Sequence, residues 1–332
     1  MYTSSKLILA IATICAVVAC SNSSDNAGQT RSLSYTAVGQ TLSRDYTVNN
    51  LFVDNKHVYL TLSDDMDDTF GYAKISSVAA ADVPYQFTYL KLPATPSYTI
   101  IGEMVIDEER SQLYIPVAIA NGANFNYTWL QYESGKTTPN DIQVGSYFVP
   151  NDLAKQFALE TATFYNNSIF ANYAGSVIGF NTVSGQASLR LENVLVSSQD
   201  AFSIQDKNTV IAISDDGNRI VRIDPATRAP IQLGESFSVL GEKGFEVSPH
   251  FTVNNNIVYM LAMKRSESTN LAHLALCNTP INADSKQWDC KTSETPLGNG
   301  SQIINIDSDT SSGTLYFVLQ NLKQGTQLYR VN

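Results

Sequence analysis

The sequence predicts an all-β protein built from repeated units, and three observations support this prediction. A short apolar strand with an aromatic or aliphatic centre recurs six times along the chain. Each copy is introduced by a polar turn and followed by a second strand, and no segment has a convincing helical periodicity. Strands at such regular spacing, with turn signals between them, are typical of all-β repeat architectures.

The repeat period favours a six-bladed β-propeller, with seven blades as the alternative. The strand centres lie 41 to 57 residues apart, about the length of four short strands and their turns. A radial ring of four-stranded blades is the best fit to that period. We expect the five aromatic centres to pack between blades, because their side chains are large and apolar. The six centres are Tyr59, Tyr114, Phe170, Ile211, Tyr259 and Tyr316. The strand that directly follows each copy is expected at residues 71–76, 128–133, 176–181, 219–224, 271–277 and 327–331.

The last blade requires a strand from the other end of the chain. The sequence stops at Asn332, directly after the second recurring strand of the sixth copy, so that blade lacks its outermost strand. An uncovered sheet edge invites unwanted pairing and is normally protected. Residues 33–38 form an isolated strand pattern ahead of the first copy. We expect this N-terminal strand to pair with the last blade and close the ring, so that the propeller domain spans 33–332.

The first residues have the layout of a signal peptide. Lys6 precedes a thirteen-residue apolar stretch from Leu7 to Ala19, and the chain then becomes abruptly polar. A membrane-spanning helix needs about 20 apolar residues, so this stretch is too short to be one. We therefore expect residues 1–19 to be removed.

The cleavage site resembles the lipobox of bacterial lipoproteins. The motif is Val17-Val18-Ala19-Cys20, in which a small residue precedes the cysteine. The resemblance implies that Cys20 carries diacylglycerol and usually a third acyl chain on its amine, and several chains give durable anchoring to a membrane. Ser21 in place of aspartate implies sorting to the outer membrane of a Gram-negative bacterium. The alternative is an ordinary secretory signal that releases a soluble periplasmic protein.

Residues 20–32 are small and polar, and they are expected to form a flexible tether between lipid and propeller. Without residues 1–19, 20 basic residues face 31 acidic ones, a formal net charge of about −11. This charge excludes nucleic acid as a partner. It also repels anionic headgroups, which favours a body tethered beside the membrane over one that lies on the lipid.

Two cysteines in the propeller domain are expected to form a disulfide. Cys277 and Cys290 remain once the signal peptide is removed and Cys20 is lipidated, and an exported protein meets an oxidising compartment. They fall on the third and fourth strands of blade five. A loop of about 14 residues closed in this way stabilises the fold by roughly 3 kcal/mol in the chain-entropy model. A metal site is the alternative, but it lacks further ligands.

The densest acidic segment lies between the first two recurring strands of blade one. Its carboxylates are a weak candidate for calcium binding, because the EF-hand spacing is absent and a solvated acidic loop is the common outcome. The candidate ligands are Asp64, Asp65, Asp67 and Asp68. No other metal and no cofactor is predicted.

Catalytic signals are weak, and the question of enzymatic activity stays open. The sequence contains no Gly-x-Ser-x-Gly, His-Glu-x-x-His or phosphate-binding glycine loop. Its three histidines, His57, His250 and His273, are expected to be ordinary residues in or beside strands. Six-bladed propellers include lactonases and sialidases, but the metal-binding set of the former and the Asp-box motifs of the latter have no match here.

These observations favour a membrane-anchored binding or scaffold propeller without catalytic activity, in the cell envelope. Its protein partner would bind loops that follow the second strand of a blade, which is the recurring strand with the large centre, at residues 63–70, 120–127 and 264–270. The competing hypothesis is an enzyme or glycan-binding module that works at the central channel, with the acidic loop as a possible metal site. Fold alone does not decide between them.

Overall fold

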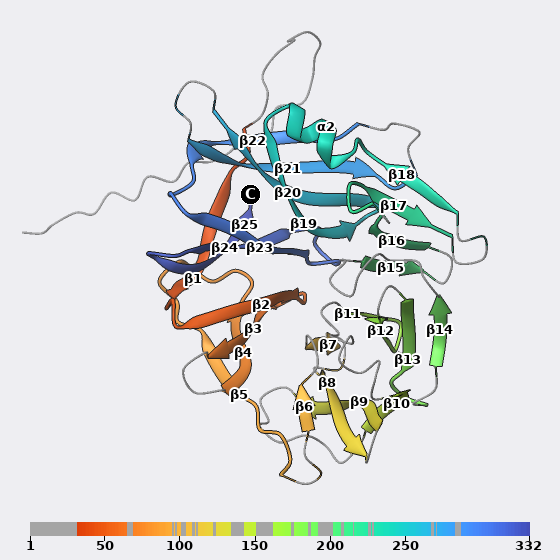
Figure 1. The fold of residues 1–332 in the computed structure, drawn as a ribbon. Coiled ribbons are helices and arrows are strands. Elements are labelled where there is room, and N and C mark those ends of the chain that lie inside the picture. Colours follow the sequence, from red (N-terminus) through yellow and green to blue (C-terminus); the bar gives the residue numbers. More distant parts are fainter. Residues whose placement is uncertain are drawn as a thin grey trace, which may run out of the picture. The chain divides into compact units, whose positions relative to one another are not determined.

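Six antiparallel sheets follow one another along the chain (Figure 1). The computed structural model describes residues 32–64, 69–94, 96, 98–100, 104–107, 110, 112–121, 124–133, 143–150, 162–173, 176–184, 187–191, 202–206, 209–214, 216–224, 227, 229–266, 269, 271–282 and 287–332. Each sheet forms one blade of the predicted architecture.

Within each blade the strands follow in chain order from the innermost outward, with two exceptions: β6 and β7 of blade 2 both pair with β8, and β1 joins blade 6 as its outermost strand. Blade 1 contains β2 (Tyr46–Val53), β3 (His57–Asp64), β4 (Thr69–Ser76) and β5 (Gln86–Tyr89). Blade 2 contains β6 (Tyr98–Ile100), β7 (Val105–Asp107), β8 (Gln112–Asn121), β9 (Asn124–Glu133) and β10 (Gln143–Pro150). Blade 3 contains β11 (Ala162–Tyr165), β12 (Ser168–Tyr173), β13 (Ser176–Asn181) and β14 (Ala187–Leu191). Blade 4 contains β15 (Phe202–Asp206), β16 (Thr209–Ile213), β17 (Ile220–Ile223) and β18 (Pro230–Leu233). Blade 5 contains β19 (Phe245–Asn254), β20 (Ile257–Arg265), β21 (Ala272–Pro280) and β22 (Asp289–Pro296). Blade 6 contains β23 (Ser301–Ser308), β24 (Leu315–Asn321), β25 (Gly325–Val331) and β1 (Tyr35–Leu42).

The blades form a closed ring. The innermost strands contact one another in the order β2, β23, β19, β15, β11 and β7. Blades 1 and 2 complete the ring through a shared apolar cluster that contains Tyr59 and Leu113. The prediction of a six-bladed β-propeller is therefore confirmed.

Apolar clusters fill all six interfaces between neighbouring blades. Each predicted strand centre lies in a different cluster, and in every case the cluster joins its own blade to the next blade along the chain. These residues, in chain order, are Tyr59, Tyr114, Phe170, Ile211, Tyr259 and Tyr316. The expectation that the five aromatic centres pack between blades is confirmed.

Asparagine pairs form two of the turns between first and second strands. Asn166 and Asn167 join β11 to β12, and Asn255 and Asn256 join β19 to β20. All four have positive φ, between 46° and 60°. Two-residue hairpin turns with positive φ at both positions match the twist of the strands they connect, and asparagine tolerates this conformation better than most residues.

A short helix, α2 (Phe237–Glu242), stands between β18 and β19 and was not predicted. The Ser236 Oγ atom caps it by accepting a hydrogen bond from the Val239 N–H at 3.4 Å. Its buried Leu240 belongs to the cluster between blades 4 and 5. Six residues are too few to produce a recognisable helical period, which explains why the sequence pattern does not reveal it.

The ring is closed by β1, which pairs antiparallel with β25 of blade 6. Tyr35 lies opposite Val331, and the register shifts between Val38 and Leu42. Gly39 occupies this irregularity with a φ of 68°, which glycine adopts without strain. The predicted pairing is confirmed, although the strand runs four residues further than residue 38.

The N-terminal segment 33–42, which we call the strap, contacts three blades. At its start, the Leu33 N–H donates to the Thr292 carbonyl oxygen of blade 5 at 3.1 Å. Its middle pairs with blade 6 through β1. Near its end, the Gly39 N–H donates to the Ala80 carbonyl oxygen of blade 1 at 3.1 Å. The strap therefore ties the first blade to the last two.

Cys277 and Cys290 form the predicted disulfide. They lie directly opposite each other on β21 and β22 of blade 5. Cys277 is fully buried in the cluster between blades 4 and 5. The bond thus fixes the outermost strand of blade 5 to its neighbour.

Removal of the strap should destabilise the whole propeller. A variant that begins at Gly39 loses most of the β1–β25 ladder and the buried side chains of Leu33 and Val38. At about 1.5 to 3 kcal/mol for each buried side chain, we expect its thermal midpoint to fall on the order of 10 °C. The control begins at Ser32 and keeps the strap. Equal unfolding temperatures for the two variants, measured by circular dichroism, would contradict this account.

Candidate functional site

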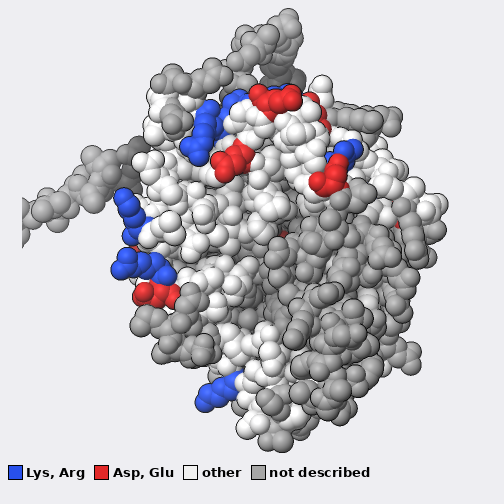
Figure 2. Space-filling model, viewed as in Figure 1, with Lys and Arg blue, Asp and Glu red and all other residues white. Residues whose placement is uncertain are grey.

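A cavity of about 790 Å³ lies on the axis of the ring. All six blades contribute to its lining, each through its innermost strand. On the face shown in Figure 2, most described charged side chains lie toward the rim. The polar groups at the axis come from residues that include Asn50, Asp107, Asn167, Ser203, Thr252 and Asp307.

Asp307 connects three blades on one side of the cavity. It belongs to β23 of blade 6, and its Oδ2 atom accepts a hydrogen bond from the Val53 N–H of blade 1 at 3.0 Å. Its Oδ1 atom accepts a hydrogen bond from the Thr252 hydroxyl of blade 5 at 3.2 Å. The adjacent Ser308 N–H also donates to this carboxylate. One side chain therefore joins the inner strands of blades 5, 6 and 1.

Further polar contacts reinforce this wall. The Thr252 and Ser308 hydroxyl oxygens lie 3.1 Å apart. While Asp307 is ionised, the Thr252 hydroxyl donates its proton to the carboxylate, and Ser308 is then the donor in this second bond. The Asn305 amide of blade 6 donates to the Asn50 Oδ1 atom of blade 1. The hydroxyls and amides on this side of the cavity are thus engaged in contacts between blades.

Burial raises the pKa of Asp307 from 3.8 to about 7. The hydrogen bonds from Ser308, Val53 and Thr252 favour the ionised form and lower the pKa, but they do not offset the loss of hydration. Asp307 is only partly exposed, and it lines the cavity. Near neutral pH this carboxyl group therefore exchanges between its charged and neutral forms.

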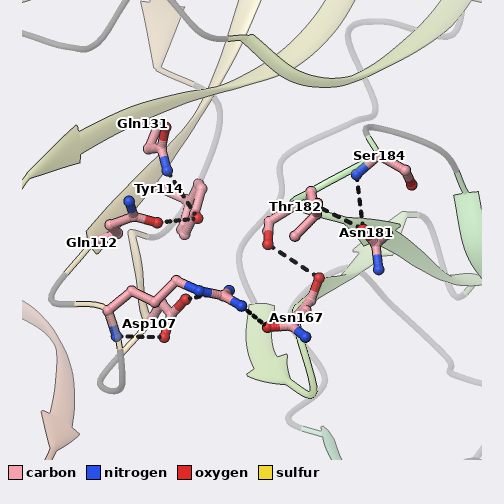
Figure 3. Close-up of polar contacts among 10 residues, drawn as sticks. Asp107, Gln112, Tyr114, Gln131, Asn167, Asn181, Thr182 and Ser184 are labelled. Carbon is pink, nitrogen blue, oxygen red and sulfur yellow. Dashed lines mark hydrogen bonds and ion pairs between the residues drawn. The ribbon is translucent and has the colours of Figure 1, made fainter.

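The opposite wall contains an acid with a basic partner. Asp107 of β7 is almost fully buried, and its carboxylate accepts hydrogen bonds from the Arg110 backbone N–H and the Arg110 guanidinium, each at 3.1 Å. The guanidinium also donates to the side-chain oxygen of Asn167 in blade 3. Figure 3 shows Asp107 and Asn167 on either side of this bridge between blades 2 and 3.

Tyr114 strengthens the same interface. Its hydroxyl donates to Gln112 at 2.9 Å and accepts from Gln131 at 3.2 Å (Figure 3). Its ring stacks on that of Phe164, with centroids 6.1 Å apart. Beside it, the Thr182 hydroxyl donates to the Asn167 carbonyl oxygen at 3.1 Å. Burial is the largest cause that raises the pKa of Tyr114, so its hydroxyl stays protonated.

One histidine lies at the cavity, a position that the sequence pattern does not indicate. His250 stands within β19 rather than before a strand, and it lines the cavity. Burial lowers its pKa, so the imidazole is neutral at pH 7. His57 lies beside Asp54, with 3.6 Å between Nδ1 and Oδ2, and His273 contacts the Ser293 carbonyl oxygen at 2.9 Å. These two fit the expected structural roles.

Irregular inner strands explain why the cavity residues are hard to recognise in the sequence. The ladder register shifts before Asn50 in β2, before Asn305 in β23 and before Phe251 in β19. The one-residue shifts in β2 and β23 reverse the sheet face to which later residues point, and in β19 two extra residues interrupt the ladder between Val247 and Phe251. Alternation along these strands therefore does not show which side chains reach the axis.

Several predicted sites lie outside the described residues. They include Cys20 with the signal peptide and most of the tether, and Asp65, Asp67 and Asp68 of the acidic segment. Asp64 ends β3, but only its backbone is described. The three loops expected to bind a partner are covered only in part. Within the described part of the chain, no group of three or more His, Cys, Asp or Glu side chains could hold a metal ion. Nor do those residues contain a helix able to span a membrane.

The raised pKa of Asp307 predicts a pH-dependent stability. Between about pH 4 and pH 7 the folded protein retains a proton that the unfolded chain releases, so this group makes the protein less stable as the pH rises. Asp307→Asn is isosteric and cannot ionise. From pH 5 to pH 8 we expect the free energy of unfolding of the variant to rise relative to that of the parent. The rise should be a few kcal/mol at most, because one pKa unit corresponds to about 1.4 kcal/mol.

Urea unfolding at several pH values measures this difference. Asp216→Asn is the matched control, because Asp216 is an exposed carboxylate whose pKa is lowered, with its hydrogen bond from Ser214 as the leading cause. If the free energies of unfolding of Asp307→Asn and the parent differ by the same amount at every pH from 5 to 8, the prediction is wrong.

Comparisons with known proteins bear on the fold alone. No protein-family model and no curated protein sequence matches the chain. The β-propeller domain of Cps50 (Swd1) from Myceliophteria thermophila is 11% identical, with a TM-score of 0.40. The match covers 86% of this chain and 99% of that domain. PorZ, a surface component of the type-IX secretion system of Porphyromonas gingivalis, is 9% identical, with a TM-score of 0.44 and coverage of 87% of this chain. An acylaminoacyl peptidase is 10% identical, with a TM-score of 0.48 and coverage of 88%. The chain spans only 38% of PorZ and 53% of that peptidase.

Proposed function

We propose that this protein is a lipid-anchored, non-catalytic binding propeller of the Gram-negative cell envelope, held at the outer membrane through Cys20. The axial cavity is its ligand site, and a protein partner in the envelope is expected at the loops. The lipobox-like motif Val17-Val18-Ala19-Cys20 supports the anchor. The fold supports a binding role because propellers present a shaped cavity on a rigid scaffold.

The contacts of the cavity hydroxyls carry the non-catalytic part of the proposal. Thr252 and Ser308 are hydrogen-bonded to each other, and Thr252 donates to Asp307. Here the hydroxyls and the carboxylate hold blades 5, 6 and 1 together. This arrangement favours a preorganised binding surface over a reaction centre.

The disulfide supports export. Disulfides persist in oxidising compartments such as the periplasm and the cell surface, and they are rare in the cytosol. The Cys277–Cys290 bond links two strands of the propeller body. It is consistent with a body that folds outside the cytoplasm, as the N-terminal motif implies.

Loss of the acylated cysteine should release the protein from the membrane. We expect the parent protein to incorporate an alkynyl palmitate analogue and to sediment with outer membranes. Cys20→Ser should incorporate none and appear in the soluble fraction, because the acidic propeller body repels anionic headgroups.

Cys15→Ser is the matched control, because Cys15 lies inside the apolar stretch and precedes the expected cleavage site. Cys15→Ser should incorporate the palmitate analogue and sediment with outer membranes, as the parent protein does. Membrane association of Cys20→Ser at the parent's level, with the label still incorporated, would refute the lipid anchor. A detergent pull-down of the two forms then tests whether a stoichiometric partner depends on the anchor.

A further inference from the structure

The axial cavity contains one carboxylate with a basic partner and one without. Asp107 is paired with Arg110 at 3.1 Å. Asp307 accepts its hydrogen bonds from two backbone N–H groups and a hydroxyl, all of them neutral. No lysine or arginine occurs among the described residues that line the cavity. A poorly hydrated carboxylate without a cation is costly, and such groups are usually paired or bound to a ligand.

Aromatic residues contribute to the wall of the same cavity. Phe52 of blade 1 and Phe164 of blade 3 are both partly buried, and each also packs against the apolar cluster between its own blade and blade 2. Phe52 directly precedes Val53, whose N–H donates to Asp307. A ring face attracts a cation that approaches within about 6 Å of its centroid. The carboxylate and the rings therefore favour the same kind of ligand.

We propose that the central cavity binds an organic ammonium ion, with its cationic nitrogen placed against Asp307 and its apolar part among the aromatic side chains. This inference rests on the proposed binding function and names the ligand class. The net charge of −10 attracts cations to the protein from solution. The cavity, at about 790 Å³, lies within the range typical of small-molecule sites.

The chemistry favours a cation over a neutral polar ligand. A bound ammonium group replaces part of the hydration that burial removes from Asp307, which a neutral ligand does less well. The other titratable groups of the described lining are the Tyr165 phenol, His250, which is neutral at pH 7, and Asp107, which is paired with Arg110. None of these three groups supplies a positive charge that would repel the ligand.

A matched pair of probes tests the proposal. Phenethylamine and 2-phenylethanol share a ring and a chain, and only the amine is charged at pH 7.5. The mature full-length protein in detergent is titrated with each by calorimetry. We expect the amine to bind at least tenfold more tightly than the alcohol, since hydrogen bonds to charged groups are worth about twofold to threefold more than neutral ones. The affinity for the amine should increase from pH 5 to pH 8, as Asp307 ionises.

Three variants assign the effect to the cavity. Asp307→Asn should weaken amine binding at least tenfold and leave binding of the alcohol unchanged. Phe52→Leu, which keeps Asp307 intact, should weaken both probes. Asp216→Asn removes an exposed carboxylate paired with Arg219 and should change neither. Thermal melts confirm that each variant is folded.

The outcomes separate this inference from the proposed function. Equal affinity for the two probes, no measurable binding of the amine, or full amine binding by Asp307→Asn would each overturn the ammonium assignment. If one of these outcomes occurs while the alcohol or a neutral oligosaccharide still binds and Phe52→Leu weakens that binding, the cavity is a binding site for uncharged ligands, and only the ligand class is wrong. The lipid anchor is tested independently by Cys20→Ser.

Discussion

The contact between each blade and the next determines the rest of this structure. A large side chain at the centre of each second strand, from Tyr59 in blade 1 to Tyr316 in blade 6, packs against the following blade. A single four-stranded sheet exposes two faces and cannot bury them alone, so each blade depends on both neighbours. The sixth contact returns to the first blade, and closure of the ring therefore completes the core.

Closure brings six innermost strands around one axis, and the cavity follows from that geometry. The inner strands are too close together for every polar group to reach water. Their polar groups therefore form hydrogen bonds with one another across neighbouring blades. Asp307 and Arg110 do this on opposite walls. The two walls differ in charge balance. Arg110 neutralises the Asp107 carboxylate on one wall, whereas the Asp307 carboxylate on the other lacks such a partner among the described residues. The proposed ligand site is the consequence of this asymmetry.

The sequence predicts the outer parts of each blade better than the axis. Second strands contain a repeated large centre flanked by turn residues, so their positions and the packing of Tyr114 or Phe170 could be anticipated. The cysteine pair was predictable from the redox compartment. His250 and Asp307 were not, because register shifts in β19 and β23 break the alternation that would show which residues face the axis. Nor does any local pattern reveal that Leu33 reaches blade 5, since that contact is a backbone pairing between distant segments.

The strap also defines a mechanical path. If Cys20 is acylated, any tension between membrane and propeller enters the fold at Leu33 and passes into the β1–β25 ladder, which lies at the outer edge of blade 6. Several hydrogen bonds of that ladder share the load, and the innermost strands around the cavity are three strands away from it. A moving membrane would thus pull on the outer edge of blade 6, three strands away from the proposed ligand site at the axis.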